Sequence, residues 1–135
     1  MAYESIEFDI SDGIALLRLN RPKVLNSLNA QLMDEMRSAL AEVSESDAAR
    51  ALVLTGNGRG FCAGADLGGG EPKPGLSVGE VVAQSMEERF NPLMRDLFHL
   101  NKPWLAAVNG TTAGGGVGIA LAADITIAAR SASFK

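Results

Sequence analysis

Two glycine-rich segments are the parts of this sequence whose residue types suit chemistry. They cover residues 60–67 (GFCAGADL) and residues 109–121 (NGTTAGGGVGIAL). Their side chains are nearly all small, so a ligand can approach the main chain closely, and glycine permits backbone angles that leave a peptide N–H free. Each segment follows an apolar stretch that is typical of a buried strand. This pattern suits the stabilisation of a negative charge by backbone N–H groups.

The second segment also opens a helix that we predict near residues 116–122. The free N–H groups and the positive dipole end of a helix start suit a developing negative charge. Structural alternatives stand beside this reading: Asp66 can cap a helix in a tight strand–helix connection, and the later glycines can let a helix pack closely. The near matches to the dinucleotide pattern G-x-G-x-x-G fail at Phe61 and Ile119, and no Gly-Lys-Ser/Thr follows either segment, which argues against NAD and ATP.

The composition restricts the class of protein. With 135 residues, 47% apolar and 21% charged, the chain is expected to form one soluble globular domain. Its net charge of −4 and the lack of a basic run argue against a nucleic-acid partner. Gly or Asp breaks the longest apolar runs, so no membrane span is expected. Cys62 is the single cysteine, which suits a reducing cytoplasm, and with one histidine it offers no metal-ligand spacing.

Hydrophobic periodicity predicts the elements that must position these segments. Asn29 is expected to cap the first helix, and Pro92 to kink or divide the second. In chain order we predict strands over 3–10 and 14–19 joined by a hairpin turn, a helix after Asn29, a buried strand over 51–55, a glycine-rich loop through 75, a helix over 77–100, a strand over 104–108, a short helix over 116–122 and a strand over 125–128. This order indicates α/β layers with strands that are at least partly parallel.

Three motifs together resemble those of the crotonase (enoyl-CoA hydratase/isomerase) superfamily. They are residues 19–29 (LNRPKVLNSLN), residues 60–67, and residues 107–116 with their terminal triple glycine, and they occur in the family's order. The resemblance covers essentially the whole chain and implies a crotonase-like α/β fold, a spiral of repeated ββα units. Within the family, residues 89–93 and 127–134 look most like the ring-epoxide isomerases of phenylacetate breakdown.

The resemblance implies an acyl-CoA thioester as substrate, with coenzyme A as part of that substrate and no further cofactor. By motif position, the backbone N–H groups of Ala65 and Gly115 would form the oxyanion hole for a thioester enolate. The residues implied in substrate binding are Val24, Leu25, Ala63, Gly64, Ala65, Asp66 and Leu67. Arg21 and Lys23 either meet CoA phosphates or are ordinary solvated side chains. Cys62 is expected to be a small buried residue rather than a nucleophile, and no catalytic role is assigned to His99.

The sequence also departs from the family. Hydratases place their first catalytic glutamate where this chain has Gly118, so isomerisation, which can run with one base, is favoured over hydration. Glu87 or Glu88 can be that base or an exposed carboxylate, and the family's second carboxylate would lie beyond Lys135.

Members are longer and finish with helices that mediate trimer contacts, so residues 1–135 are expected to be an N-terminal core without the C-terminal helical part. A homotrimer or a dimer of trimers is expected for the full-length protein. The alternatives are a non-catalytic acyl-CoA-binding relative and an inactive truncated fragment.

Overall fold

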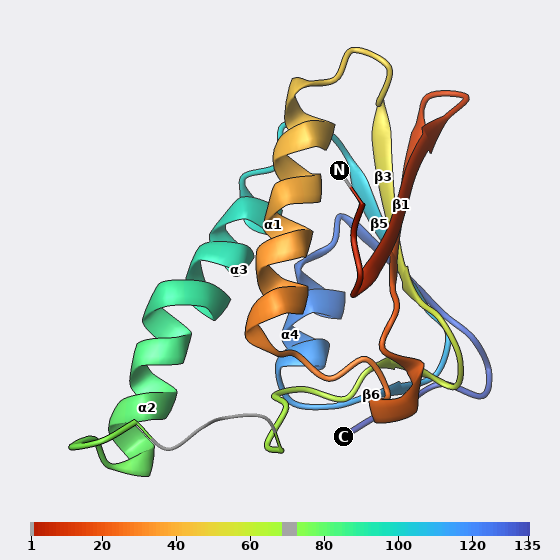
Figure 1. Ribbon diagram of the computed structural model, residues 1–135. Helices are drawn as coiled ribbons and strands as arrows, with labels where there is room; N and C mark the ends of the chain where they lie inside the picture. The colour runs from red at the N-terminus through yellow and green to blue at the C-terminus, as the bar shows by residue number, and fades with distance from the viewer. Residues whose placement is uncertain (1, 69–72) are drawn as a thin grey trace.

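The computed structural model describes residues 2–68 and 73–135, and within them the main sheet has the strand order β1-β2-β3-β5-β7 (Figure 1). Its strands are β1 (Ile6–Ser11), β2 (Ile14–Leu19), β3 (Ala51–Gly56), β5 (Trp104–Val108) and β7 (Ile125–Ala128). β1 is antiparallel to β2, and every later pairing in this sheet is parallel. The predicted α/β class with partly parallel strands is therefore confirmed. Residues 69–72 of the predicted loop lie outside the described residues.

The N-terminal hairpin forms where the sequence predicts it. Ser11 pairs with Ile14, so a two-residue turn joins β1 to β2. Asp12 and Gly13 both have positive φ angles, of 52° and 83°, which is the conformation that suits the right-handed twist of the flanking strands. Arg50 donates its backbone N–H to the Gly13 carbonyl at 2.7 Å, which ties the turn to the start of β3.

One face of the main sheet is covered by α1 (Ala30–Glu45), which packs on β1 and β2, and α3 (Asn91–Phe98) lies beside α1 in Figure 1. The Asn29 side chain accepts the Leu32 N–H at 2.9 Å, so the predicted N-cap of α1 is confirmed. The helix then buries its apolar stripe against alternate residues of the strands. The buried residues that meet in this layer include Leu17, Leu19, Leu32, Met36, Leu40, Val43, Leu52, Leu54, Leu93, Leu97 and Trp104.

The second helical region is divided near Pro92, as predicted. It consists of α2 (Val78–Ser85), the π-helical turn η2 (Met86–Phe90) and α3, and Ser77 and Glu80 form a capping box at its start. Proline has no N–H to donate, and its ring crowds the carbonyl four residues earlier. The Asn91 N–H reaches back to the Met86 carbonyl, five residues away, so a wider turn accommodates the proline. The sequence predicts the interruption at Pro92 but not its π-helical form.

A second, smaller sheet contains β4 (Gly60–Cys62), β6 (Thr111–Thr112) and β8 (Ser133–Phe134), all parallel. Sequence patterns did not predict these strands, because two or three residues are too few to establish a period of two. Consecutive strands alternate between the sheets: β3 and β4, then β5 and β6, then β7 and β8. Helices follow the first two pairs, and the later one is α4 (Gly115–Ala122). This is the expected spiral of ββα units.

The pairing of β4 with β6 brings the two glycine-rich segments together. The strands are adjacent and parallel, so the segments that leave their C-terminal ends lie side by side. Ala113 donates its N–H to the Cys62 carbonyl at 3.0 Å. A Cβ atom on Gly116 would overlap that same carbonyl, so α4 can pack here only with glycine at this position.

Two glycines of α4 should respond oppositely to alanine. We expect Gly116→Ala to lower the free energy of unfolding by about 1–3 kcal/mol, because the new methyl group meets fixed backbone atoms. Gly118 has open space around its Cβ position, so Gly118→Ala should raise that free energy by about 0.5–1 kcal/mol through helix propensity. Urea unfolding of both variants checks this, and equal effects would contradict the close backbone contact at Gly116.

Candidate active site

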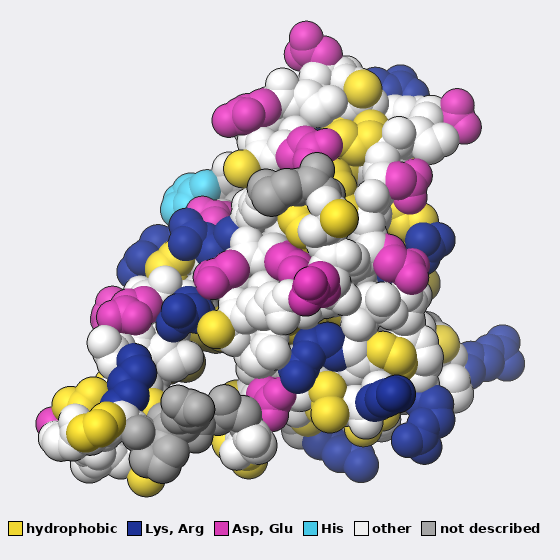
Figure 2. Space-filling model, viewed as in Figure 1, with side chains coloured by type: hydrophobic (Ala, Val, Ile, Leu, Met, Phe, Trp, Pro, Cys, Tyr) yellow, Lys and Arg dark blue, Asp and Glu magenta, His cyan; other side chains and the backbone are white. Residues whose placement is uncertain are grey.

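A cavity of about 680 Å³ lies between α2 and the segment that follows β4. Both Ala65 and Gly115, the two predicted donors, line it. Its other lining residues are Leu28, Met33, Asp66, Leu67, Lys73, Leu76, Val78, Val81, Val82, Ser85, Met86 and Phe90. The molecular surface is hollowed beside the α2 region at the lower left of Figure 2. The cavity therefore has the two glycine-rich segments on one side and an apolar helix on the other.

The orientation of the Ala65 N–H follows from its pairing with Leu28. These residues form an isolated parallel bridge, in which Leu28 donates to the Gly64 carbonyl at 2.7 Å and accepts from the Asp66 N–H at 2.9 Å. In a parallel bridge the neighbours of the central residue point toward the partner, so the central N–H points away from it. Within the described residues, no group accepts a hydrogen bond from the Ala65 N–H.

The Gly115 N–H is free for a different reason, which is its place at the start of α4. Gly114 is the N-cap, with φ 52° and ψ −125°, a conformation that strongly favours glycine. Gly116 donates to Ala113 at 2.9 Å and Val117 donates to Gly114 at 3.0 Å, which leaves the N–H of Gly115 without an acceptor in the described part of the chain. The positive end of the helix dipole lies behind it.

Glycine at position 115 leaves this wall of the cavity uncrowded. A Cβ there would lie 2.9 Å from Cε2 of Phe90 and 3.2 Å from Cδ1 of Leu28, so the ends of these side chains would have to shift. Gly64, which precedes the other donor, has φ 92°, and a Cβ on it would lie 2.9 Å from the Ala113 carbonyl oxygen. The small residues thus hold two free N–H groups on one wall, and such a pair of donors can stabilise a developing oxyanion.

Asp66 is the only carboxylate among the described lining residues, and its interactions hold it in place. The Gly68 N–H donates to its Oδ1 at 3.0 Å, and Arg21 pairs with its Oδ2 at 2.9 Å. The hydrogen bond from Gly68 and then that from Arg21 hold the pKa of Asp66 below its usual value. Asp66 is therefore a fixed anion at neutral pH. Glu87 and Glu88 do not line the cavity, so neither takes the position of a base there.

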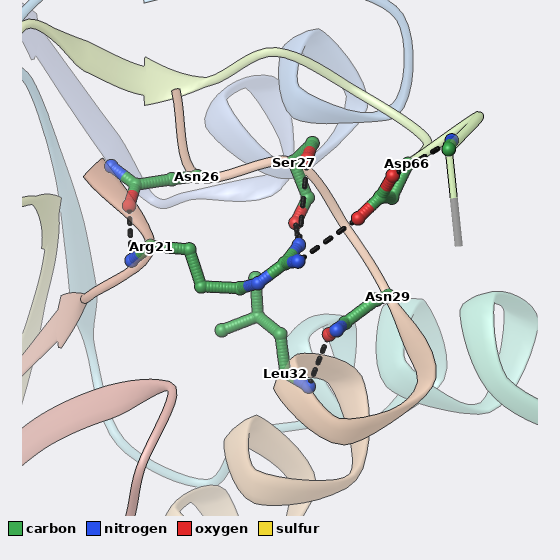
Figure 3. Close-up of polar contacts among 7 residues, drawn as sticks. Arg21, Asn26, Ser27, Asn29, Leu32 and Asp66 are labelled. Atoms are coloured by element: carbon green, nitrogen blue, oxygen red, sulfur yellow. Dashed lines mark hydrogen bonds and ion pairs between the residues drawn. The ribbon is translucent and has the colours of Figure 1, made fainter. Parts of the chain in front are cut away.

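Two sequence-based alternatives for this region are wrong. No helix begins at Asp66, so it is not a helix cap; it closes a turn onto Gly68 instead. Arg21 is not an ordinary solvated side chain, because its guanidinium bonds both Asp66 and the carbonyl of Ser27 (Figure 3). Its side chain is only 19% exposed. These contacts join residues that lie 45 positions apart, which a local pattern does not predict.

The other predicted binding residues lie at or beside the cavity. Leu67 lines it and is 95% exposed, whereas Ala63 and Gly64 flank it without contributing to its wall. Val24, which is 44% exposed, ends the 3-10 turn η1 (Pro22–Val24), and Leu25 follows it. Leu25 accepts the Ala63 N–H at 3.0 Å, so this turn lies against the segment that follows β4.

The helical region from α2 to η2 forms the apolar wall of the cavity. Val81, Val82, Met86 and Phe90 fall at helical spacing in the sequence, but the sequence assigns none of them individually to substrate binding. In the structure all four line the cavity, and Val82 and Met86 remain 54% and 40% exposed. Met33 of α1 also lines the cavity. A core face and a ligand-facing wall have the same helical period, so the sequence does not separate them.

Two other side chains considered from the sequence, Cys62 and His99, do not line the cavity. Cys62 is fully buried, and burial raises the pKa of its thiol to about 11, partly offset by the hydrogen bond from the Gly64 N–H. His99 ends α3 outside the cavity, with Nδ1 3.1 Å from the Arg95 carbonyl oxygen.

Among the described residues, no three His, Cys, Asp or Glu side chains form a group suited to a metal ion. No described helix is both long and apolar enough to cross a membrane.

The fold and the paired donors define the crotonase-like class of α/β proteins. Residues 9–135 match the enoyl-CoA hydratase/isomerase family, and the chain belongs to that family. Among solved structures, an enoyl-CoA hydratase from Bacillus anthracis superimposes with a TM-score of 0.84 at 34% identity, over 97% of this chain and 50% of that one. The crotonase-like fold that the sequence motifs imply is therefore confirmed.

Curated relatives agree with this family. A protein named probable enoyl-CoA hydratase from Rhodobacter capsulatus is 46% identical over 99% of this chain and 49% of its own length. The 1,2-epoxyphenylacetyl-CoA isomerase of Escherichia coli K12 is 44% identical over 97% of this chain and 50% of its own length. The chain thus spans about half the length of the curated relatives it matches.

Burial of Cys62 predicts a loss of stability in alkali. Unfolded chains release the thiol proton near pH 9, whereas the folded protein holds it to about pH 11. Stability is therefore unaffected by this group below pH 9 and falls as pH rises from 9 to 11, by up to about 1.4 kcal/mol per pH unit. Urea unfolding at several pH values checks this, with Cys62→Ala as the control that lacks the contribution. Parallel pH dependences in both proteins would contradict it.

Proposed function

We propose that this chain binds an acyl-CoA thioester and holds the thioester carbonyl oxygen between the backbone N–H groups of Ala65 and Gly115. The observation that carries this proposal is that both residues line one cavity and that neither N–H has an acceptor in the described residues. Membership of the enoyl-CoA hydratase/isomerase family supports it. In this proposal coenzyme A is part of the substrate, and no separate cofactor is required.

The chemistry assigned to these donors is stabilisation of an enolate. When a proton leaves the carbon beside a thioester carbonyl, negative charge accumulates on the carbonyl oxygen. Two fixed N–H groups stabilise that charge without reorganising, and one such donor contributes about 3–4 kcal/mol of transition-state stabilisation in other enzymes. The helix dipole behind Gly115 acts in the same direction.

We favour isomerisation over hydration for the whole protein. Gly118 lies one turn beyond Gly115 on α4 and supplies no carboxylate, and the carboxylate of Asp66 is held by Arg21 and Gly68. Isomerisation needs one base, which can remove a proton and return it at another carbon. We propose that this base comes from sequence that corresponds to the other half of the longer relatives. A cytoplasmic homotrimer, or a dimer of trimers, is the proposed assembly.

The surface offers an apolar region and a basic region, which suit the two parts of an acyl-CoA. The wall from α2 and η2 is apolar, which favours an uncharged acyl group. Lys and Arg side chains gather over the lower part of the face in Figure 2, whereas most Asp and Glu side chains lie above them. Such a local basic region can meet CoA phosphates although the chain as a whole is acidic. The Escherichia coli relative is named for an aromatic acyl-CoA, which the apolar wall would also accommodate.

A non-catalytic acyl-CoA-binding role is the second candidate. The observation that favours it is that, among the described lining residues, the one carboxylate is already engaged by Arg21. Solvent deuterium exchange at the carbon beside the carbonyl separates the two candidates. Exchange that the protein accelerates supports an enzyme, whereas binding without accelerated exchange supports the binding protein.

Removal of the Ala65 N–H should weaken recognition of the carbonyl, because only the Gly115 donor remains. Ala65→Pro lacks this donor, and Ala65→Ser keeps it with a small side chain. We expect the parent chain and Ala65→Ser to bind octanoyl-CoA roughly 30-fold more tightly than the octyl-CoA thioether, which lacks the carbonyl oxygen, because two hydrogen bonds contribute about 1 kcal/mol each. Ala65→Pro should retain a preference of roughly fivefold in calorimetry, with circular dichroism confirming the fold. A folded Ala65→Pro that keeps the full preference would refute the assignment.

The apolar wall predicts a dependence of affinity on acyl size. Each methylene group buried against α2 should contribute up to about 0.8 kcal/mol, so hexanoyl-CoA should bind about tenfold more tightly than butanoyl-CoA. Glutaryl-CoA, with a terminal carboxylate, should bind more weakly than either, because burial of that charge against the apolar wall costs desolvation free energy. Calorimetric titration of the three thioesters checks the order, and equal affinities would place the acyl group outside the cavity.

A further inference from the structure

We propose that Arg21 is a positioning residue. It holds the Ala65 N–H in its donor orientation because its guanidinium hydrogen-bonds to both of the chain segments that form the Leu28–Ala65 bridge. The proposal rests on the function proposed above for Ala65. It assigns to Arg21 a role in carbonyl recognition that needs no contact with the ligand.

The first step is that the donor orientation depends on very little pairing. The bridge between Leu28 and Ala65 is isolated, with one hydrogen bond on each side of Ala65. The same two segments share one further backbone bond, from the Ala63 N–H to the Leu25 carbonyl at 3.0 Å, which lies before Gly64 and does not hold the Asp66 side of the bridge. A continuous sheet would fix each peptide through its neighbours, but a single bridge leaves the peptide free to rotate when one bond breaks. An additional restraint on this bridge therefore has a direct effect on where the Ala65 N–H points.

The second step is that Arg21 provides this restraint from both sides. One terminal nitrogen of its guanidinium donates to the Ser27 carbonyl, and the other donates to the Asp66 carboxylate at 2.9 Å. Figure 3 shows both contacts. Ser27 precedes Leu28 and Asp66 follows Ala65, so the two contacts lie immediately beside the bridge in the sequence. The planar guanidinium fixes the separation of these contacts.

The third step is that Arg21 is itself anchored to the rest of the fold. Its backbone N–H donates to the Asn26 side chain at 2.8 Å. Asn26 is fully buried, has φ 56°, and donates to the carbonyls of Asn57 and Gly60 at 3.0 and 2.9 Å. Through Asn26, the contacts of Arg21 therefore connect the bridge to the start of β4, the strand that leads into the donor segment.

The fourth step concerns charge. The carboxylate of Asp66 lies on the cavity wall next to Ala65, where it would repel a developing oxyanion. The Arg21 guanidinium, only 19% exposed, compensates this charge in place. Arginine thus fixes the donor and cancels the neighbouring anion at once. Lysine would keep the charge but has no fork that reaches both acceptors in fixed geometry.

Arg21→Lys tests the proposal, with Arg37→Lys as a matched control. Arg37 also pairs with an aspartate, Asp96, but it joins α1 to α3 outside the cavity. The readout is the ratio of the dissociation constants of octyl-CoA thioether and octanoyl-CoA. We expect Arg21→Lys to reduce this ratio from about 30 toward about five, the contribution of Gly115 alone, while the thioether constant changes less than twofold. Arg37→Lys should leave the ratio unchanged.

Amide hydrogen exchange supplies a second readout that needs no ligand. The Asp66 N–H, which donates to Leu28, should exchange at least tenfold faster in Arg21→Lys, whereas the Ala113 N–H, which donates to Cys62, should be unaffected. If Arg21→Lys does not fold, Asp66→Asn replaces it, because asparagine keeps an acceptor for Gly68 but weakens the hydrogen bond from Arg21. Both readouts should then move in the same direction by a smaller factor.

The outcomes separate this proposal from the one on which it rests. If the parent chain binds thioester and thioether equally, the function proposed for Ala65 fails. If the parent chain prefers the thioester and Arg21→Lys keeps that preference, the positioning role of Arg21 fails. A parallel loss of affinity for both ligands, with uniformly faster exchange, would show that Arg21 only stabilises the fold and would also overturn the positioning role.

Discussion

The parallel pairing of β4 with β6 is the interaction on which the candidate site depends. These strands contain only three and two residues, yet their pairing aligns the exits of two ββα units at the same edge of the small sheet. Each exit is a glycine-rich turn, and each turn leaves one N–H without an acceptor among the described residues. Because both turns start from paired strands, Ala65 and Gly115 line one cavity although they lie 50 positions apart in the sequence.

The two donors are freed by different means, and both means require small residues. The Ala65 N–H is free because its neighbours pair with Leu28, whereas the Gly115 N–H is free because it begins a helix. The close approach of the segments leaves no room for side chains: a Cβ on Gly116 would overlap the Cys62 carbonyl. The glycines therefore serve packing and chemistry together, and the structural alternative of close packing describes the same contacts rather than a competing arrangement.

Polarity is distributed unevenly around this cavity. α2 and η2 present an apolar wall to it, and the opposite wall carries main-chain donors and one carboxylate held by Arg21. An apolar setting strengthens each polar interaction within it and raises the cost of any unpaired charge. That cost explains why Asp66 is bonded twice at its carboxylate and why its partner comes from a distant segment.

The sequence by itself determined the features whose causes are local. Asp12 and Gly13 adopt left-handed angles in a two-residue turn, Asn29 caps the helix beside it, and Pro92 interrupts its own helix, so each could be predicted from a few adjacent residues. The glycine-rich segments were recognisable for the same reason, since glycine carries its conformational freedom at its own position.

The tertiary structure decided the features that depend on distant partners. β4, β6 and β8 exist only because they pair with one another, and their two or three residues are too short to form a pattern. The sequence around Arg21 does not predict its partner, because Asp66, to which its guanidinium donates, lies in a distant segment. The apolar face of α2 is compatible with packing on a core or with facing a cavity, and only the tertiary structure shows that it lines a cavity. In each case the deciding contact joins segments far apart in the sequence, so local patterns predicted the elements and only the fold placed them around one cavity.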